Sequence, residues 1–140
     1  MYPNEHITGP IINAAYQLHK QLGPGLIESV YEAVLTQMLE RRGFRVERQK
    51  PISFEFDGIR FDETFRIDML VNEQVVVELK AVEKVAPVHL RQLLTYLKIM
   101  KLPVGLLINF GEATISDGVR RVLNSQQLAG TSGGADIVNK

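Results

Sequence analysis

The chain has 140 residues, 16 basic and 16 acidic side chains, a formal net charge of zero and no cysteine. This length suits one domain with a buried core, and the missing cysteines exclude disulfides, thiolate metal sites and a cysteine nucleophile. The even charge balance argues against a nucleic-acid coat protein, which is usually basic, and no apolar run or N-terminal segment predicts a membrane span or signal peptide. We therefore expect a cytoplasmic protein without a membrane partner.

Two helices are predicted at the start of the chain. Apolar residues at helical spacing predict the first from about Thr8 to Leu22, with Thr8 as the N-cap and Pro10 in the first turn. After the break at 23–25, a second helix is predicted over 26–42, with Gly43 as the C′ residue. Its apolar positions form one stripe: Ile27, Val30, Tyr31, Val34, Leu35, Met38 and Leu39.

Two residues of the second helix are open to more than one interpretation. Glu28 lies in the first turn, where the helix dipole favours a carboxylate, and Tyr31 lies three residues later on the same face. From the residues alone, a first-turn acid and a core tyrosine explain both.

The middle of the chain is predicted to form strands. Residues 44–49 alternate weakly and 52–56 alternate well, and Asp57-Gly58 is a strong hairpin signal before a returning strand over 59–71. A polar turn at Asn72-Glu73 then leads to Val75–Val82, whose nearly uniform apolarity is typical of a strand buried on both faces.

Charged side chains interrupt this buried strand. Glu78 and Lys80 are two residues apart and so point to one face, and Asp68 on the preceding strand can reach the same place. Because an unpaired buried charge is costly, we expect these groups to be paired or used. Our hypothesis is that Asp68, Glu78 and the carbonyl of Leu79 bind Mg²⁺ or Mn²⁺ while Lys80 serves the attacking water or the phosphate. The alternative is an ordinary charge pair on a half-exposed strand.

A third helix is predicted from about Ala86 to Met100, with Pro87 near its start. His89, Gln92 and Tyr96 share one face of it, and Gln92 could hold a phosphate oxygen or the nucleophilic water. A solvated polar face is the alternative.

The chain ends with a buried strand over 104–110 and a weaker segment over 119–123 that is either a short strand or a helical turn. The order of elements predicts a single α/β domain over residues 1–124, with a mixed sheet flanked by helices. Residues 125–140 are glycine-rich at their centre and are predicted to be a flexible tail.

The segment Gly25-Leu26-Ile27-Glu28-Ser29-Val30-Tyr31 resembles the signature of the GxxExxY proteins, a family placed in the PD-(D/E)XK nuclease superfamily. The resemblance extends from about Ile7 to Leu123 and includes Asp68, Glu78-Leu79-Lys80 and the segment 106–111. It implies a restriction-endonuclease-like core of helix, three strands, helix and strand, with an extra N-terminal helix.

The resemblance also implies roles for single residues. Asp68, Glu78 and Leu79 would bind the metal, Glu28 would add an acid from the helix, and Lys80 would be the catalytic lysine; Ile67 stands where the superfamily's name has proline. Gln92 is similar to the glutamine of a catalytic Gln-x-x-x-Tyr motif completed by Tyr96, and Tyr31, Tyr96 and His89 are supporting candidates.

The implied activity is an Mg²⁺- or Mn²⁺-dependent nuclease acting on DNA rather than RNA. Two alternatives stay open. One is a catalytically silent nucleic-acid-binding or regulatory module on the same fold. The other is a chain that works as a homodimer, through the Asp57-Gly58 hairpin or the first helix.

Overall fold

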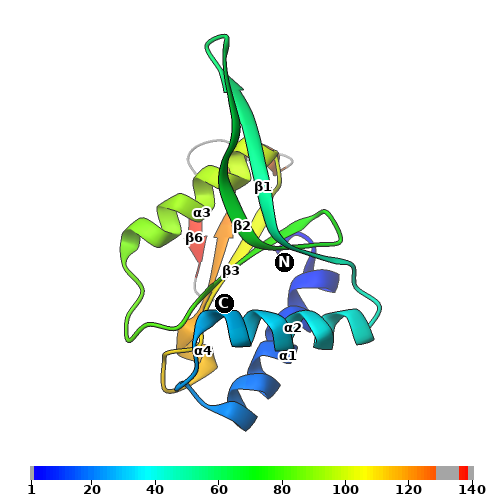
Figure 1. Cartoon of the computed structure of the whole chain (residues 1–140), viewed down its shortest axis with the longest axis vertical. Helices are drawn as coiled ribbons and strands as arrows, with labels where there is room; N and C mark the ends of the chain where they lie inside the picture. Colours follow the sequence, from blue (N-terminus) through cyan, green and yellow to red (C-terminus); the bar gives the residue numbers. More distant parts are fainter. Residues whose placement is uncertain (1, 129–135, 139–140) are drawn as a thin grey trace.

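The computed structural model describes residues 2–128 and the backbone of 136–138. It contains a six-stranded sheet in the order β1-β2-β3-β4-β5-β6, in which all neighbours are antiparallel except β3 and β4 (Figure 1). The elements are α1 (Glu5–Leu22), α2 (Glu28–Arg41), β1 (Val46–Phe56), β2 (Ile59–Val71), β3 (Val75–Lys80), α3 (Pro87–Met100), β4 (Val104–Asn109), α4 (Ile115–Gly118), β5 (Val119–Leu123), η1 (Ser125–Gln127) and β6 (Asp136–Val138). The predicted mixed sheet flanked by helices, with an extra N-terminal helix, is confirmed.

Helices cover both faces of the sheet. The helices α1 and α2 pack on one face, where Val75 and Val77 point, and α3 packs on the other, where Val76 points. Because β3 lies between two cores, successive side chains are buried on alternate faces, which explains why its sequence is apolar apart from Glu78 and Lys80. The parallel β3–β4 pair is joined by α3 as a crossover, as parallel neighbours require.

The helix boundaries differ from the predictions at their N-termini. The helix α1 begins three residues earlier than predicted, so Thr8 is buried inside it and is not its N-cap, and Pro10 lies beyond the first turn. The buried Ile7 extends the apolar stripe backwards, which overrides the capping signal of Thr8. The helix α2 begins at Glu28, two residues later than predicted, so Ile27 lies outside the helix and is exposed.

The end of α2 matches its prediction. Gly43 has a φ of +92° and donates its N–H to the carbonyl of Glu40 at 3.0 Å, and the N–H of Phe44 reaches the carbonyl of Leu39 at 3.1 Å. This is the Schellman arrangement, in which a C′ glycine satisfies the last carbonyls of a helix.

Strands β1 and β2 form one long hairpin that extends beyond the rest of the sheet (Figure 1). We call its outer part, residues 53–65, the arm. The predicted turn at Asp57-Gly58 is confirmed, with both residues at positive φ, 53° and 77°. The Asn72-Glu73 turn is confirmed as well, whereas β3 ends at Lys80, two residues earlier than predicted.

Residues 119–123 form the strand β5, which settles the choice between a strand and a helical turn. The predicted C-terminal tail lies largely outside the described residues, but within it Ser125–Gln127 form a 3-10 turn and Asp136–Val138 pair with β5. None of the helices in the described part of the chain has the length and apolarity needed to cross a membrane.

Candidate active site

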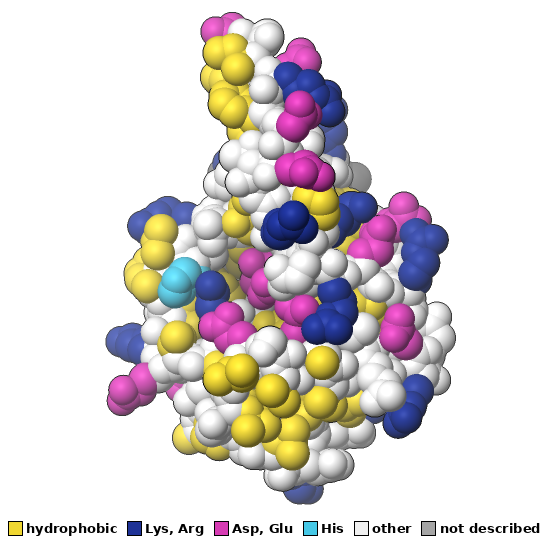
Figure 2. Space-filling view, viewed as in Figure 1, with side chains coloured by type: hydrophobic (Ala, Val, Ile, Leu, Met, Phe, Trp, Pro, Cys, Tyr) yellow, Lys and Arg dark blue, Asp and Glu magenta, His cyan; other side chains and the backbone are white. Residues whose placement is uncertain are grey.

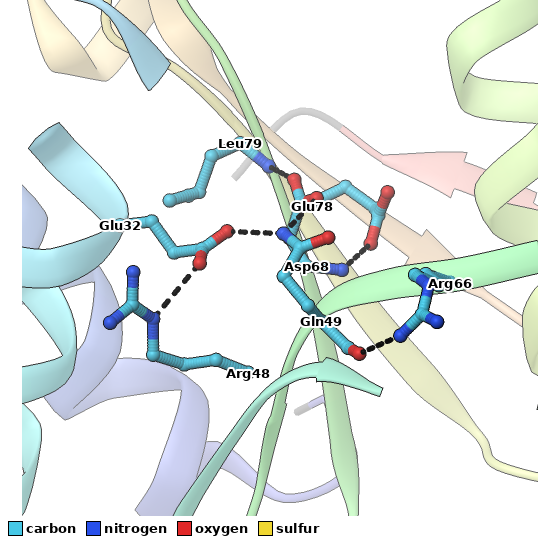
Figure 3. Close-up of polar contacts among 7 residues, drawn as sticks. All are labelled: Glu32, Arg48, Gln49, Arg66, Asp68, Glu78 and Leu79. Atoms are coloured by element: carbon cyan, nitrogen blue, oxygen red, sulfur yellow. Dashed lines mark hydrogen bonds and ion pairs between the residues drawn. The ribbon is translucent and has the colours of Figure 1, made fainter. Parts of the chain in front are cut away.

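Strands β2 and β3 separate at the two predicted acids. Their last ladder pair is Met69 with Val77. Beyond it, the N–H of Asp68 donates to Glu78 Oε2 at 2.8 Å, and the N–H of Leu79 donates to Asp68 Oδ2 at 2.8 Å (Figure 3). Each carboxylate thus accepts a backbone N–H of the neighbouring strand, which a backbone carbonyl would accept if the ladder continued. The structure brings Asp68, Glu78 and Leu79 together, as the sequence predicted.

The surroundings of the two carboxylates disfavour their charged forms. Glu78 is only 8% exposed, and burial, with the charge of Asp68 as the second cause, raises its pKa to about 8. Burial also raises the pKa of Asp68, and the charge of Glu32 adds to that shift. The half-buried Lys80 opposes both shifts without cancelling them. Two neighbouring acids in this state favour a proton or a cation between them.

A third acid, Glu32 of α2, belongs to this site and was not predicted. It is buried, its Oε2 accepts a hydrogen bond from Arg48 Nε at 2.9 Å, and its Oε1 accepts one from Gln49 Nε2 at 2.7 Å (Figure 3). One signal was available in the sequence, since Glu32 lies one turn after Glu28 and between the apolar stripe residues Tyr31 and Leu35. An acid in the buried part of an amphipathic helix needs a partner or a function.

Gln49 links the acid of α2 to the acid of β2. Its Nε2 contacts Glu32 Oε1 and also lies 3.3 Å from Asp68 Oδ1. Gln49 has a φ of +48°, a conformation that residues other than glycine rarely adopt. The pleat of the neighbouring strand also shifts here, because Ile67 packs in the α3 core whereas Met69, two residues later, packs in the α1–α2 core. Strain of this kind is often found at functional sites.

Asp68 and Glu32 border an open cleft of about 470 Å³, which is lined by Glu28, Ser29, Glu32, Arg48, Gln49 and Asp68. Figure 2 shows acidic side chains gathered in the hollow below the base of the arm, with basic side chains at its edge. Glu28 is exposed and lies at the border of the cleft. Glu28 therefore shares the cleft with Asp68, but the acid whose charge raises the pKa of Asp68 is Glu32.

Tyr31 supports the site from beneath and does not line the cleft. Its ring stacks on Phe110 with centroids 4.3 Å apart. Its hydroxyl donates to the carbonyl of Gly23 and accepts the N–H of Leu26 at 3.1 Å. These bonds hold the loop that precedes α2, so Tyr31 fixes where the helix begins and thereby where Glu28 stands.

The three predicted residues of α3 have different surroundings. Tyr96 is buried, and its pKa is raised by burial and by the charges of Glu78 and Asp68. Gln92 is exposed, and the buried Nδ1 of His89 has no hydrogen-bond partner among the described residues. Within the described part of the chain, neither Gln92 nor His89 hydrogen-bonds to an acid of the site.

The donor set fits a hard divalent cation. No group of three or more His, Cys, Asp or Glu side chains is arranged around a common metal position among the described residues. Two carboxylates and one main-chain carbonyl nevertheless suit Mg²⁺ or Mn²⁺, since Mg²⁺ usually keeps several waters and takes only one or two protein carboxylates. The burial of Glu78 beside Asp68 supports the fit, because a cation there would offset both the burial of the charge and the repulsion between the two acids, which together raise the pKa of Glu78.

The free energy of unfolding should therefore depend both on pH and on whether a metal ion is bound. Between pH 4.5 and about 8 the folded protein binds more protons at Glu78 than the unfolded chain, so the metal-free free energy of unfolding should fall as pH rises through this range. We expect a loss on the order of a few kcal/mol. Urea unfolding in EDTA at both ends of the range would measure it, with Glu78→Gln as the control that removes the dependence. A flat profile for the wild-type protein would contradict the assignment.

Comparison with known proteins gives one match. A family model described as the PD-(D/E)XK nuclease superfamily matches residues 5–122. No curated protein and no solved structure matches the chain significantly.

Proposed function

Because this chain belongs to the PD-(D/E)XK nuclease superfamily, we propose that it is a metal-dependent nuclease that hydrolyses phosphodiester bonds, in DNA rather than RNA. The observation that carries the proposal is the pair of carboxylates at the split between β2 and β3, the buried Glu78 and the half-buried Asp68, each of which accepts a backbone N–H from the other strand. A buried carboxylate beside a second acid, without a full countercharge, is destabilising unless it binds a proton or a cation.

We propose a role for each residue that agrees with its position. A divalent cation, Mg²⁺ or Mn²⁺, held by Asp68, Glu78 and the Leu79 carbonyl would polarise the phosphoryl group and lower the pKa of a bound water. Lys80 lies two residues after Glu78 and so shares its face of β3. Its ammonium group would orient the attacking water or neutralise charge on the phosphate. Glu28 and Gln92 are proposed to act on the solvent side, Glu28 as a further metal ligand and Gln92 on a phosphate oxygen or the water.

We propose that Gln49 positions Asp68 for the metal. Replacing it with alanine removes the bridge between Glu32 and Asp68, so we expect the affinity for Mn²⁺ to fall about 10- to 100-fold, as it does when a hydrogen-bond partner of a metal ligand is lost. Calorimetric titration would measure this, and Gln37→Ala, an exposed position on α2, is the matched control. Equal affinities in the two variants would show that Gln49 has only a structural role.

The proposed activity can be tested on labelled single-stranded, duplex and branched DNA and on RNA, each with Mg²⁺, Mn²⁺ or EDTA. We expect metal-dependent cleavage that is lost in Lys80→Ala, which also controls for contaminating nucleases. Absence of cleavage together with absence of metal binding would instead support a catalytically silent binding module on the nuclease fold.

Within the superfamily, we propose that the chain is one of the GxxExxY proteins. Gly25, Glu28 and Tyr31 supply the signature. Two of these residues have a physical reason for their identity, since Tyr31 anchors the loop before α2 and Glu28 opens the helix at the border of the cleft.

A further inference from the structure

The arm has one apolar face. Phe54 pairs across the hairpin with Phe61, and Phe56 pairs with Ile59. Because alternate residues of a strand share a face, these four side chains lie together. Phe56 is 72% exposed and Ile59 is 57% exposed, and Figure 2 shows hydrophobic side chains along one side of the arm and charged ones along the other. A contiguous exposed apolar patch of this kind often marks a binding surface.

The same face borders a groove. A hollow of about 590 Å³ lies between the arm and the C-terminal end of α3. Phe54, Phe56, Phe65 and Ile99 make it apolar. Lys98 and Lys101 bring two positive charges to it, against one negative charge from Glu55. The groove thus runs from the base of the arm towards its tip, with α3 as one wall.

Aromatic stacking fixes the arm to the domain. The rings of Phe61, Phe54, Phe65 and Tyr96 form a continuous series, with successive centroids 4.9, 5.8 and 4.7 Å apart. Tyr96 is part of the α3 core, so the base of the arm is tied to the sheet and to α3. The exposed tip is therefore held in place before any partner binds, which reduces the entropic cost of association.

Charge distinguishes between the possible partners. The arm has one base, Arg60, and four acids, so its net formal charge is 1 − 4 = −3; the acids are Glu55, Asp57, Asp62 and Glu63. A polyanion such as nucleic acid is repelled by such a segment. The lysines at the groove have the opposite charge. The tip is apolar and acidic, and the groove is apolar with two lysines on its α3 wall against the single acid Glu55, so the tip and the α3 side of the groove complement each other.

We propose that the arm binds a second copy of this chain, with the two apolar faces packed against each other and the arms antiparallel. In this arrangement the tip of each arm lies over the groove of its partner, Phe56 entering the groove and the acidic tip facing Lys98 and Lys101. The contact is isologous and closes as a two-fold dimer. The proposal does not depend on the nuclease activity.

The oligomeric state tests the proposal directly. Size-exclusion chromatography with light scattering should give a mass twice the 15.8 kDa of the chain. The double variant Phe56→Ser and Ile59→Ser should raise the dissociation constant by at least about tenfold, as expected for buried aromatic anchors of an interface. Tyr16→Ser removes an aromatic ring that is 53% exposed on α1 and should leave the dimer unchanged. Circular dichroism melting would show that the double variant and Tyr16→Ser are both folded.

The absence of cysteine allows a sharper test of the orientation. Phe56→Cys and Lys98→Cys are made as separate proteins and oxidised alone or mixed. In the mixture a disulfide between positions 56 and 98 can form only between two copies, and we expect linked dimers there and few in either protein alone. A monomer at all micromolar concentrations would overturn the proposal, as would equal cross-linking in the unmixed proteins. A monomer whose affinity for a labelled oligonucleotide falls on Phe56→Ser and Ile59→Ser would assign the face to nucleic acid instead.

Discussion

Replacing Glu78 with glutamine is expected to abolish metal-dependent hydrolysis, with a loss of roughly a thousandfold or more in rate, while the fold stays intact. Glutamine has nearly the same shape and keeps an oxygen that can accept the N–H of Asp68, now bonded to Glu78 Oε2 at 2.8 Å. It removes the negative charge on which binding of the cation depends. Asp68→Asn is expected to behave in the same way. The measurement is the rate of cleavage of the best substrate in Mg²⁺.

The stability of Glu78→Gln shows whether its loss of activity comes from the missing charge or from unfolding. Because burial raises the pKa of Glu78 to about 8, a neutral amide should leave the metal-free protein at pH 8 as stable as the wild type or more so. Glu40→Gln, an exposed acid of α2, is the matched control and should retain full activity. Full activity of purified Glu78→Gln would refute the assignment of the site.

The second large effect is expected on stability, from Gly111→Ala. A Cβ atom at this position would lie 2.2 Å from the carbonyl oxygen of Val82 and 2.6 Å from its nitrogen, both of them backbone atoms. Val82 cannot move away easily, because Asn109 accepts its N–H at 3.0 Å and donates to its carbonyl at 2.8 Å. We expect a loss of about 3 kcal/mol in the free energy of unfolding, which is roughly a 10 °C fall in Tm.

Gly25→Ala provides the comparison for this experiment. No atom of residues 2–128 lies within 4 Å of a Cβ built there, and its φ is not in the left-handed region. Its effect should stay within about 0.5 kcal/mol, as for most exposed positions. Equal unfolding midpoints for Gly111→Ala and Gly25→Ala would mean that the chain relaxes around Gly111, and the Asn109–Val82 contact would then not be rigid.

The local parts of the fold could be predicted from the sequence because their causes are local. Asp57-Gly58 has the residues that a turn with two positive φ angles requires, and Gly43 has the freedom that a helix end requires. The apolar run of β3 showed that the strand is buried on both faces. The start of α1 was placed wrongly because the burial of Ile7 against the sheet outweighs the capping preference of Thr8.

The site was predicted only in part, for a related reason. Asp68 and Glu78 could be paired because the spacing of adjacent strands brings them together. Glu32 and Gln49 were missed because their contact joins α2 to β1 across 17 residues, and no local pattern encodes how a helix packs on a strand. The positive φ of Gln49 is likewise imposed by the tertiary structure, since its sequence neighbours do not require it. Glu28 was predicted from the family resemblance, and its position at the border of the cleft agrees with that prediction without testing its role.

The most direct test of the proposed metal site is calorimetric titration of the protein with Mn²⁺ at pH 7, repeated in two buffers with different ionisation enthalpies. With a pKa of about 8, Glu78 is mostly protonated at pH 7 in the metal-free protein, so binding should displace close to one proton per ion. We predict saturable binding with this proton release in the wild type and the loss of both in Glu78→Gln. Absence of Mn²⁺ binding in the wild type, or equal binding by the variant, would contradict the account.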